Sequence, residues 1–336
     1  MRRYKILIVL LLCALLCGCA GKTSVSGEGL WVHYLDVGQA DCALLECDGE
    51  YILIDGGNVG DSSLVVSYLE KAGVEELKAV ICTHAHEDHV GGLAGVLAVY
   101  PTEAVYAPTR THASDCFDDF VYYTDQQGLE ITIPQVGDTI AFGQAEAEVL
   151  GPIQSYAELN NTSIVMMVTY GSNRFLFTGD METLAETDLM ESSAKLKADV
   201  LKVGHHGSDS STSYRLLYEV DPEYAIISVG KDNQYGHPNE VPLSRLEDAE
   251  VTVYRTDLHG TVVVHSDGAA LTIDCEGNSA PQKPSAEKIT YIGNKNSKKI
   301  HLESCSSLPV EKNQVIFDDL QTALDEGYSY CSKCME

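Results

Sequence analysis

Short apolar runs separated by turn residues follow one another from Trp31 to about Glu276. Their length, and turn pairs such as Asp48-Gly49 between them, are typical of β-strands. The predicted strands cover residues 30–37, 42–47, 50–57, 77–84, 145–152, 163–170, 174–180, 198–206, 224–230, 250–256 and 260–266.

Between these strands, a few segments carry apolar residues at helical spacing. They cover residues 62–73, which stops at Gly73, 89–100, which is interrupted by glycines, 181–192 and 213–220. Many strands, few helices, and strand ends rich in His and Asp predict two packed sheets with helices outside and a site along one rim.

The chain has 336 residues, more than a single hydrophobic core of roughly 250 to 300 residues accommodates. The segment GNSAPQKPSAEK, residues 277–288, has no large apolar residue and is predicted to be a linker. We therefore expect a large module over residues 30–276 and a small one over residues 289–336.

The first 19 residues have the features of a sorting signal. Basic residues precede an apolar run that ends at Cys17, and this run is shorter than the roughly 20 residues of a membrane span. The ending LCGC resembles the lipobox of bacterial lipoproteins, which implies cleavage before Cys19 and lipidation of that cysteine. An ordinary cleaved signal and an uncleaved anchor are the alternatives. The prediction is an exported protein, tethered by residues 20–29 to the outer face of the cell membrane.

The composition is strongly acidic, with 50 Asp and Glu against 22 Lys and Arg and a net charge of -28. Loss of the three basic residues in the signal would bring the charge to about -31. Such a surface repels phosphate backbones and has no basic footprint. The composition therefore disfavours tight, non-specific binding to nucleic acid.

Potential metal ligands are crowded into THAHEDH, residues 83–89, which follows a predicted buried strand. His84 and His86 are two apart at the strand end, so both rings can point to one side, and Asp88 and His89 follow after the chain turns. Imidazole and carboxylate are ordinary ligands of zinc and are accepted by manganese or iron. The motif predicts a site for one or two divalent metals, with zinc or manganese expected.

This motif resembles the HxHxDH signature of the metallo-β-lactamase fold, an αββα sandwich that binds metals at its rim. The strings LDVGQADCALLE, NNTSIVMMVTYG, LKVGHHGSDSSTS and VGKDNQYGHP are similar to the β-lactamase-like domain of the ComEC family of DNA-uptake proteins. The same branch resembles phosphorylcholine esterases that act on teichoic acid. Both resemblances imply hydrolysis of phosphoesters.

The resemblance also implies ligand sets. One metal would be held by His84, His86 and Asp180, where Asp180 occupies the position of the family's bridging aspartate. The other would be held by Asp88, His89, Asp180 and His237. His205 would contact the substrate phosphate or the leaving group, with His206 as a second choice, and His205 and His237 could exchange roles.

The chain departs from the wider family in one place. No histidine occurs between His112 and Asp180, where the family usually has a ligand. Asn161 or Ser163 is expected to approach the site instead. Weaker zinc binding, a manganese preference or a single occupied site would follow.

Two further acids are expected at the site. Asp55 matches a family carboxylate that supports the ligands from behind. Asp41 either faces the rim or closes a turn. The implied chemistry is attack on phosphorus by metal-activated hydroxide, with Asp88 and His205 as the catalytic residues.

The C-terminal module carries His301, Cys305, Cys331 and Cys334 in an H-x3-C…C-x2-C arrangement. This pattern resembles the small zinc-binding domain of the DNA-repair protein Ada and predicts one structural zinc, which a module of this size needs as a staple. Disulfides are the alternative for an exported chain.

The favoured function is hydrolysis of a phosphodiester, with DNA as the expected substrate and DNA-uptake machinery as a candidate partner. One alternative is a phosphoesterase for teichoic-acid or choline-type phosphates, which needs no basic groove. A non-catalytic lipoprotein that binds a metal or another ligand is the second alternative. Oligomeric state is not predicted.

Overall fold

The computed structural model describes residues 28–277, 279–283, 290–318 and 320–335. The predicted signal with Cys19 and part of the linker lie outside these residues. Within them, no helix is both long enough and apolar enough to cross a membrane.

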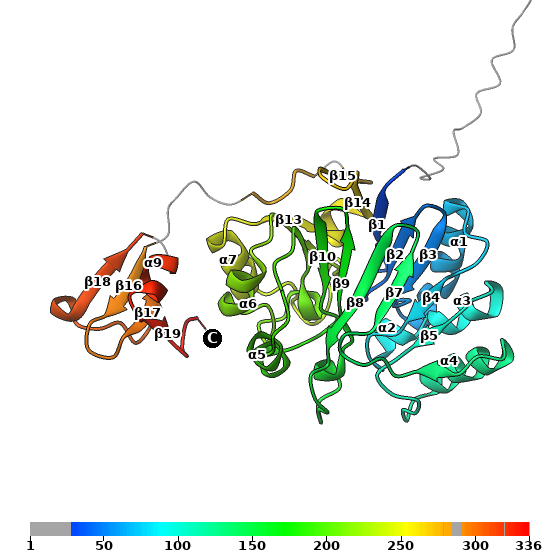
Figure 1. The fold of residues 1–336 in the computed structure, drawn as a ribbon, viewed down its shortest axis with the longest axis horizontal. Coiled ribbons are helices and arrows are strands. Elements are labelled where there is room, and N and C mark those ends of the chain that lie inside the picture. Colours follow the sequence, from blue (N-terminus) through cyan, green and yellow to red (C-terminus); the bar gives the residue numbers. More distant parts are fainter. Residues whose placement is uncertain (1–27, 278, 284–289, 319, 336) are drawn as a thin grey trace, which may run out of the picture.

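Two large sheets form the centre of the fold (Figure 1). The first has the strand order β15-β14-β1-β2-β3-β4-β5-β6. Its strands are β1 Leu30–Tyr34, β2 Ala43–Cys47, β3 Glu50–Ile54, β4 Ala79–Ile81, β5 Val105–Tyr106, β6 Ile131–Thr132, β14 Val262–Ser266 and β15 Leu271–Cys275. The strands from β3 to β6 are parallel, so their carboxyl ends meet at one edge.

The second sheet has the order β13-β12-β11-β10-β9-β8-β7. Its strands are β7 Thr139–Phe142, β8 Ala145–Gly151, β9 Val165–Tyr170, β10 Asn173–Phe177, β11 Val200–Lys202, β12 Tyr224–Ile227 and β13 Thr252–Arg255. Strands β10 to β13 are parallel, so the segments that follow them also leave from one edge.

Helices cover both outer faces of the sandwich. The described helices of this part are α1 Ser62–Ala72, α2 Glu87–Val90, α3 Leu93–Val99, α4 Asp115–Gln126, α5 Thr183–Glu191, α6 Tyr214–Val220, α7 Glu240–Asp248 and α8 Thr256–His259. One apolar cluster joins α1, α3 and α4 to the first sheet, a second lies between the sheets, and a third joins α5, α6 and α7 to the second sheet. The predicted αββα sandwich is confirmed.

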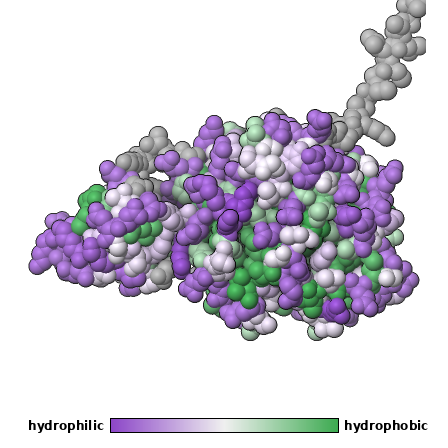
Figure 2. Space-filling view, viewed as in Figure 1, coloured by the Kyte–Doolittle hydropathy of each residue, from purple (hydrophilic) through white to green (hydrophobic). Residues whose placement is uncertain are grey.

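A separate four-stranded sheet follows, in the order β18-β16-β17-β19. Its elements are β16 Tyr291–Asn294, β17 Lys299–Leu302, β18 Gln314–Phe317, α9 Leu320–Asp325 and β19 Ser329–Tyr330. Its apolar cluster includes Tyr214 of α6, so the small sheet packs on the large module. Figure 2 shows a face that is mostly hydrophilic, as the acidic composition predicts.

Candidate metal centre

The motif at residues 83–89 forms a tight corner after β4. His84 is fully buried, His86 stands at the N-terminus of α2, and His89 lies on that helix. Gly92 permits the corner, because a Cβ there would lie 2.0 Å from the carbonyl oxygen of Gly56. The predicted interruption of the helix over 89–100 lies at Gly91 and Gly92, between α2 and α3, where the Gly92 N–H donates to the carbonyl oxygen of Gly57.

One group of four donors lies within 4.8 Å at this corner: Asp88, His89, Asp180 and His206. His89 Nε2 is 3.3 Å from Asp180 Oδ1, and His206 Nε2 is 3.2 Å from Asp88 Oδ2. His89 Nε2 and Asp180 Oδ1 are buried and have no hydrogen-bond partner. Two converging buried ligand atoms without partners fit a metal ion.

A second group faces the other oxygen of the same aspartate. His84 Nε2 lies 2.9 Å from His86 Nδ1 and 3.9 Å from Asp180 Oδ2. Asp180 follows β10, and Ser163 Oγ accepts its backbone N–H at 3.0 Å. Asp180 Oδ2 also lies 3.7 Å from His206 Nε2, so this oxygen stands between the two donor groups, while Oδ1 faces His89.

The first donor group differs from the prediction, because His206 and not His237 lies with Asp88, His89 and Asp180. His205, His206 and Gly207 all have left-handed backbone, with φ of 49°, 53° and 80°. In this turn the His206 ring points inward and the His205 ring points to the rim. The spacing of residues in the sequence does not show which of the two adjacent rings points inward. The ring of His237 lies 6.5 Å from that of His206, on the cleft wall.

Asp55 lies behind His89. Its Oδ2 is 2.8 Å from His89 Nδ1 and 2.7 Å from the hydroxyl of Thr83, and its Oδ1 accepts the Thr83 N–H. A carboxylate there holds the proton on His89 Nδ1 and leaves Nε2 as a ligand atom.

Asp41 lies behind His206 and supports it by its charge. It is buried, and its Oδ1 lies 3.3 Å from His206 Nδ1, which also lies 3.0 Å from the carbonyl oxygen of Ser228. The ammonium of Lys202, inside the second sheet, lies 2.6 Å from Asp41 Oδ2. Asp41 therefore points behind the site and not into the cleft. Lys202 was not predicted, although a lysine inside the apolar run ADVLKVG was a usable signal.

The buried acids around the site favour positively charged groups next to them. Burial opposes ionisation of Asp180, yet His89 and His206 hold the pKa of its carboxyl well below the usual range. Burial also opposes protonation of His206, but Asp180 and Asp41 outweigh it and raise its pKa to about 10. The field that retains this proton also attracts a metal cation in its place.

His205 stands at the rim with partners that the sequence did not indicate. Its Nδ1 lies 3.3 Å from Glu182 Oε1 and 3.3 Å from Ser210 Oγ, and Asn160 Nδ2 lies 3.4 Å from its Nε2. These residues come from three separate segments, so no local pattern joins them.

Of the two alternatives Asn161 and Ser163, the structure places Ser163 at the site. Asn161 Oδ1 accepts the backbone N–H groups of Glu182 and Ala185 and so holds the start of α5. Its neighbour Asn160 faces His205 instead. Ser163 Oγ lies 3.4 Å from His84 Nδ1 and supports that ring from behind.

The two donor groups open into a cleft of about 560 Å³. The described residues that line it are Gln39, Asn58, His86, Glu87, Asp88, Asp180, His205, His206, Asn233, Gln234, Tyr235 and His237. This lining contains no lysine or arginine, so metal ions and histidines are its available positive groups.

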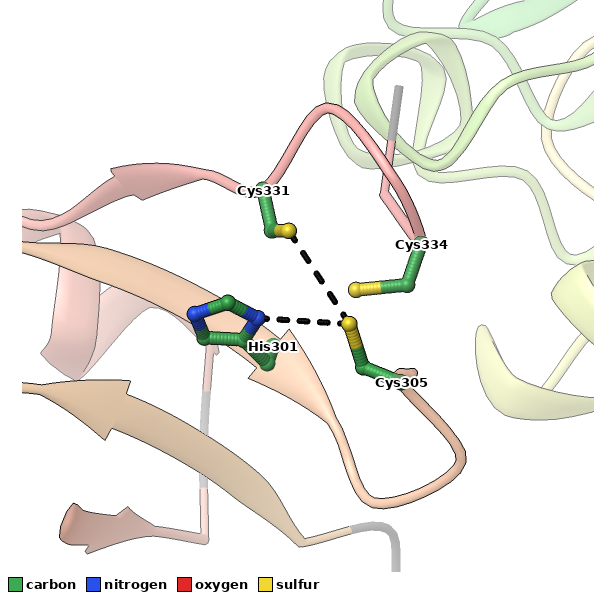
Figure 3. A group of neighbouring side chains, drawn as sticks. All are labelled: His301, Cys305, Cys331 and Cys334. Atoms are coloured by element: carbon green, nitrogen blue, oxygen red, sulfur yellow. Dashed lines mark hydrogen bonds between the residues drawn. The ribbon is translucent and has the colours of Figure 1, made fainter. Parts of the chain in front are cut away.

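The C-terminal ligands also converge (Figure 3). His301, Cys305, Cys331 and Cys334 lie within 4.8 Å of one another, and Figure 3 shows their donor atoms pointing to a common centre. The Sγ atoms of Cys305 and Cys331 are 4.0 Å apart, and His301 Nδ1 is 3.3 Å from Cys305 Sγ. Zn–S bonds of about 2.3 Å place tetrahedral sulfurs roughly 3.8 Å apart. The described cysteines are all free, and this spacing fits a metal better than a disulfide.

The packed sheets, outer helices and His/Asp rim define a metal-binding αββα protein. The model of the family described as "Metallo-beta-lactamase superfamily" matches residues 35–231 of the chain. The chain therefore belongs to this superfamily, whose members are generally metal-dependent hydrolases.

Among curated proteins, the chain is related to competence proteins. It is 30% identical to ComE operon protein 3 of Bacillus subtilis, over 71% of this chain and 33% of that protein. It is 32% identical to Recombination protein 2 of Haemophilus influenzae, over 70% of this chain and 28% of that protein. The chain thus spans about a third of these relatives. Among solved structures, YhfI of Bacillus subtilis matches with a TM-score of 0.49 and 15% identity, over 71% of this chain and all of that one.

Proposed function

We propose that this protein is an exported, lipid-anchored phosphodiesterase that hydrolyses DNA. The observation that carries the proposal is the position of Asp180 between two donor groups beside an open cleft. The relationship to competence proteins supports DNA as the substrate. The predicted signal and Cys19 support a place at the outer face of the membrane, where DNA-uptake machinery would be the partner.

His84, His86 and Asp180 would hold one divalent metal, and Asp88, His89, Asp180 and His206 the other. Bound there, such ions supply Lewis-acid activation of water and of the phosphoryl oxygens. Asp55 and the carbonyl oxygen of Ser228 keep the protons of His89 and His206 on Nδ1, so that each Nε2 remains a ligand atom.

His205 is the proposed proton donor to the leaving oxygen, because it lines the cleft and is not one of the four clustered donors Asp88, His89, Asp180 and His206. Glu182 and Ser210 lie at its Nδ1 and orient the ring, so that Nε2 faces the substrate. Asn160 is placed to donate to a phosphoryl oxygen beside it.

A second candidate is a phosphoesterase for small choline-type or teichoic-acid phosphates. The absence of lysine and arginine from the described lining favours it, because a long DNA strand needs backbone contacts that a small ester does not.

The test uses the soluble chain from residue 20 with added manganese or zinc. Release of small fragments from labelled single-stranded DNA is compared with hydrolysis of p-nitrophenyl phosphorylcholine. Asp180→Ala is expected to abolish the reaction, whereas Asp119→Ala, an exposed acid on α4, retains it. If the metal-loaded protein cleaves only the choline ester, the DNA proposal is refuted and the second candidate is supported. Loaded protein that cleaves neither substrate would refute both.

A further inference from the structure

A second hollow, of about 400 Å³, lies on the outer face of the first sheet. It is formed by β1, β14, β15 and α1 and shares no residue with the metal cleft. Its described lining is Trp31, His33, Tyr68, Lys71, Ala72, Thr261, Val263, Asp274, Cys275 and Glu276. The volume is within the range of small-molecule sites.

Two lining side chains have buried nitrogen atoms without partners. Along β1, Leu30, Val32 and Tyr34 face the core between the sheets, so Trp31 and His33 point to the opposite face. His33 is 1% exposed, and its Nδ1 lies 2.9 Å from the hydroxyl of Tyr68. Its Nε2 and the Trp31 Nε1 have no hydrogen-bond partner. Such orphaned groups are rare in proteins and indicate a missing partner.

The chemistry of these groups restricts the ligand. The indole N–H can only donate, so the ligand must offer an acceptor to Trp31. Asp274 and Glu276 at the same hollow accept, so the ligand must also donate. Lys71 also lines the hollow, but the two acids outnumber it, so the net charge disfavours an anion. A simple cation has no acceptor for the indole. Hydroxyl groups both donate and accept.

The aromatic side chains add a shape requirement. Trp31 and Tyr68 are both partly exposed at the hollow and offer apolar ring surface beside the polar groups. Burial lowers the pKa of His33 to about 4, so its ring is neutral near pH 7 and adds no charge that would select an ion. A flat ring with an apolar face and hydroxyl edges fits this combination.

We propose that this hollow binds a neutral sugar, with Trp31 Nε1 and His33 Nε2 bonded to its oxygen atoms. The proposal is independent of the metal centre and of the reaction proposed there. It gives the large module a second binding site, for a neutral glycan.

The chain offers a direct probe, because Trp31 is its only tryptophan. The single indole N–H resonance of the full chain is followed by NMR while the trimer of N-acetylglucosamine or maltotriose is added to millimolar concentration. A saturable shift with either trimer is expected, and the responding trimer identifies the kind of sugar. The proposal would be overturned if neither trimer shifts the indole resonance, or if phosphorylcholine shifts it more than either trimer does.

Variants test the contacts by calorimetry. Trp31→Phe keeps an aromatic ring but removes the donor, and His33→Ala removes the second contact. Each is expected to weaken binding by about 2- to 10-fold, the effect of one lost hydrogen bond. Tyr235→Phe, at the metal cleft, is the control and binds like wild type. Unchanged affinity in folded Trp31→Phe and His33→Ala would contradict the assignment.

Discussion

Asp55 shows how one residue that does not face the cleft can govern the metal centre. Asp55→Asn either presents its amide N–H₂ to His89 Nδ1 or loses the bond from the Thr83 N–H, because its single oxygen replaces only one of Oδ2 and Oδ1. The proton of His89 would then move to Nε2, the ligand atom. We expect metal affinity to fall by about 10- to 100-fold. Competition with a chromogenic chelator measures this change. Asp119→Asn is the matched control, and equal affinity in both variants would contradict the role of Asp55.

Glu46 of β2 is a buried acid away from the metal centre. It is 1% exposed, its Oε2 has no hydrogen-bond partner, and burial raises its pKa to about 7. The folded protein therefore holds this proton more tightly than the unfolded chain, whose value is near 4.5. The free energy of unfolding must fall as the pH rises from about 4.5 through about 7.

Glu46→Gln removes this titration while nearly keeping the shape. We expect the variant to be more stable than wild type by about 1 to 3 kcal/mol at pH 8, and equally stable near pH 4.5. Urea unfolding at both pH values measures the difference. A gain that is the same at both values would show that Glu46 does not titrate in this way.

At the scale of elements, the turn that presents His205 and His206 is held by α5. Glu186 of α5 is buried and accepts the backbone N–H groups of Thr212 and Ser213, just before α6, and Arg245 of α7 lies close enough to favour its charge. The histidine turn itself has left-handed, non-glycine backbone, which costs about 1 to 3 kcal/mol per residue. This carboxylate thus fixes one end of a strained segment.

Glu186→Ala leaves two buried N–H groups without an acceptor. We expect a loss of about 2 to 4 kcal/mol in the free energy of unfolding and a lower hydrolysis rate, because the loop that carries His205 is no longer fixed. Glu186→Gln keeps one acceptor oxygen and should lose less of both. Chemical denaturation and the hydrolysis assay, run on both variants, give the comparison. Equal hydrolysis rates in wild type and Glu186→Ala would show that Glu186 has no effect on the position of His205.

Most elements of the sandwich could be predicted from the sequence, because an apolar run bounded by turn residues directly indicates a buried strand or helix. The helices α4 and α7 were not predicted, since their apolar positions are diluted by acids and, in α7, by a proline. The motif at 83–89 could be predicted because its residues are neighbours in the chain. The partners of His205 could not, and the inward turn of His206 depends on backbone angles that residue spacing does not encode.

At the scale of the whole molecule, the C-terminal sheet joins the large module through α6. Tyr214 of α6 packs in one apolar cluster with Leu302, Leu320 and Met335 and bonds to Asp248 of α7. The loop that carries His205 ends where α6 begins. The small sheet therefore covers the outer side of the helix that follows the loop carrying His205.

The integrity of that small sheet should depend on its four ligands, because so few residues cannot bury a sufficient core alone. Cys305→Ser, or a strong chelator, is expected to abolish slow hydrogen exchange in β16–β19 while β1–β14 remain protected. Mass spectrometry of exchanged peptides measures both regions, and Cys275→Ser, a cysteine outside the cluster, should change neither. If a reductant alone removes the protection and a chelator does not, disulfides hold the module instead of a metal. Loss of protection in α6 as well would show that the docked sheet stabilises the helix next to the loop that carries His205.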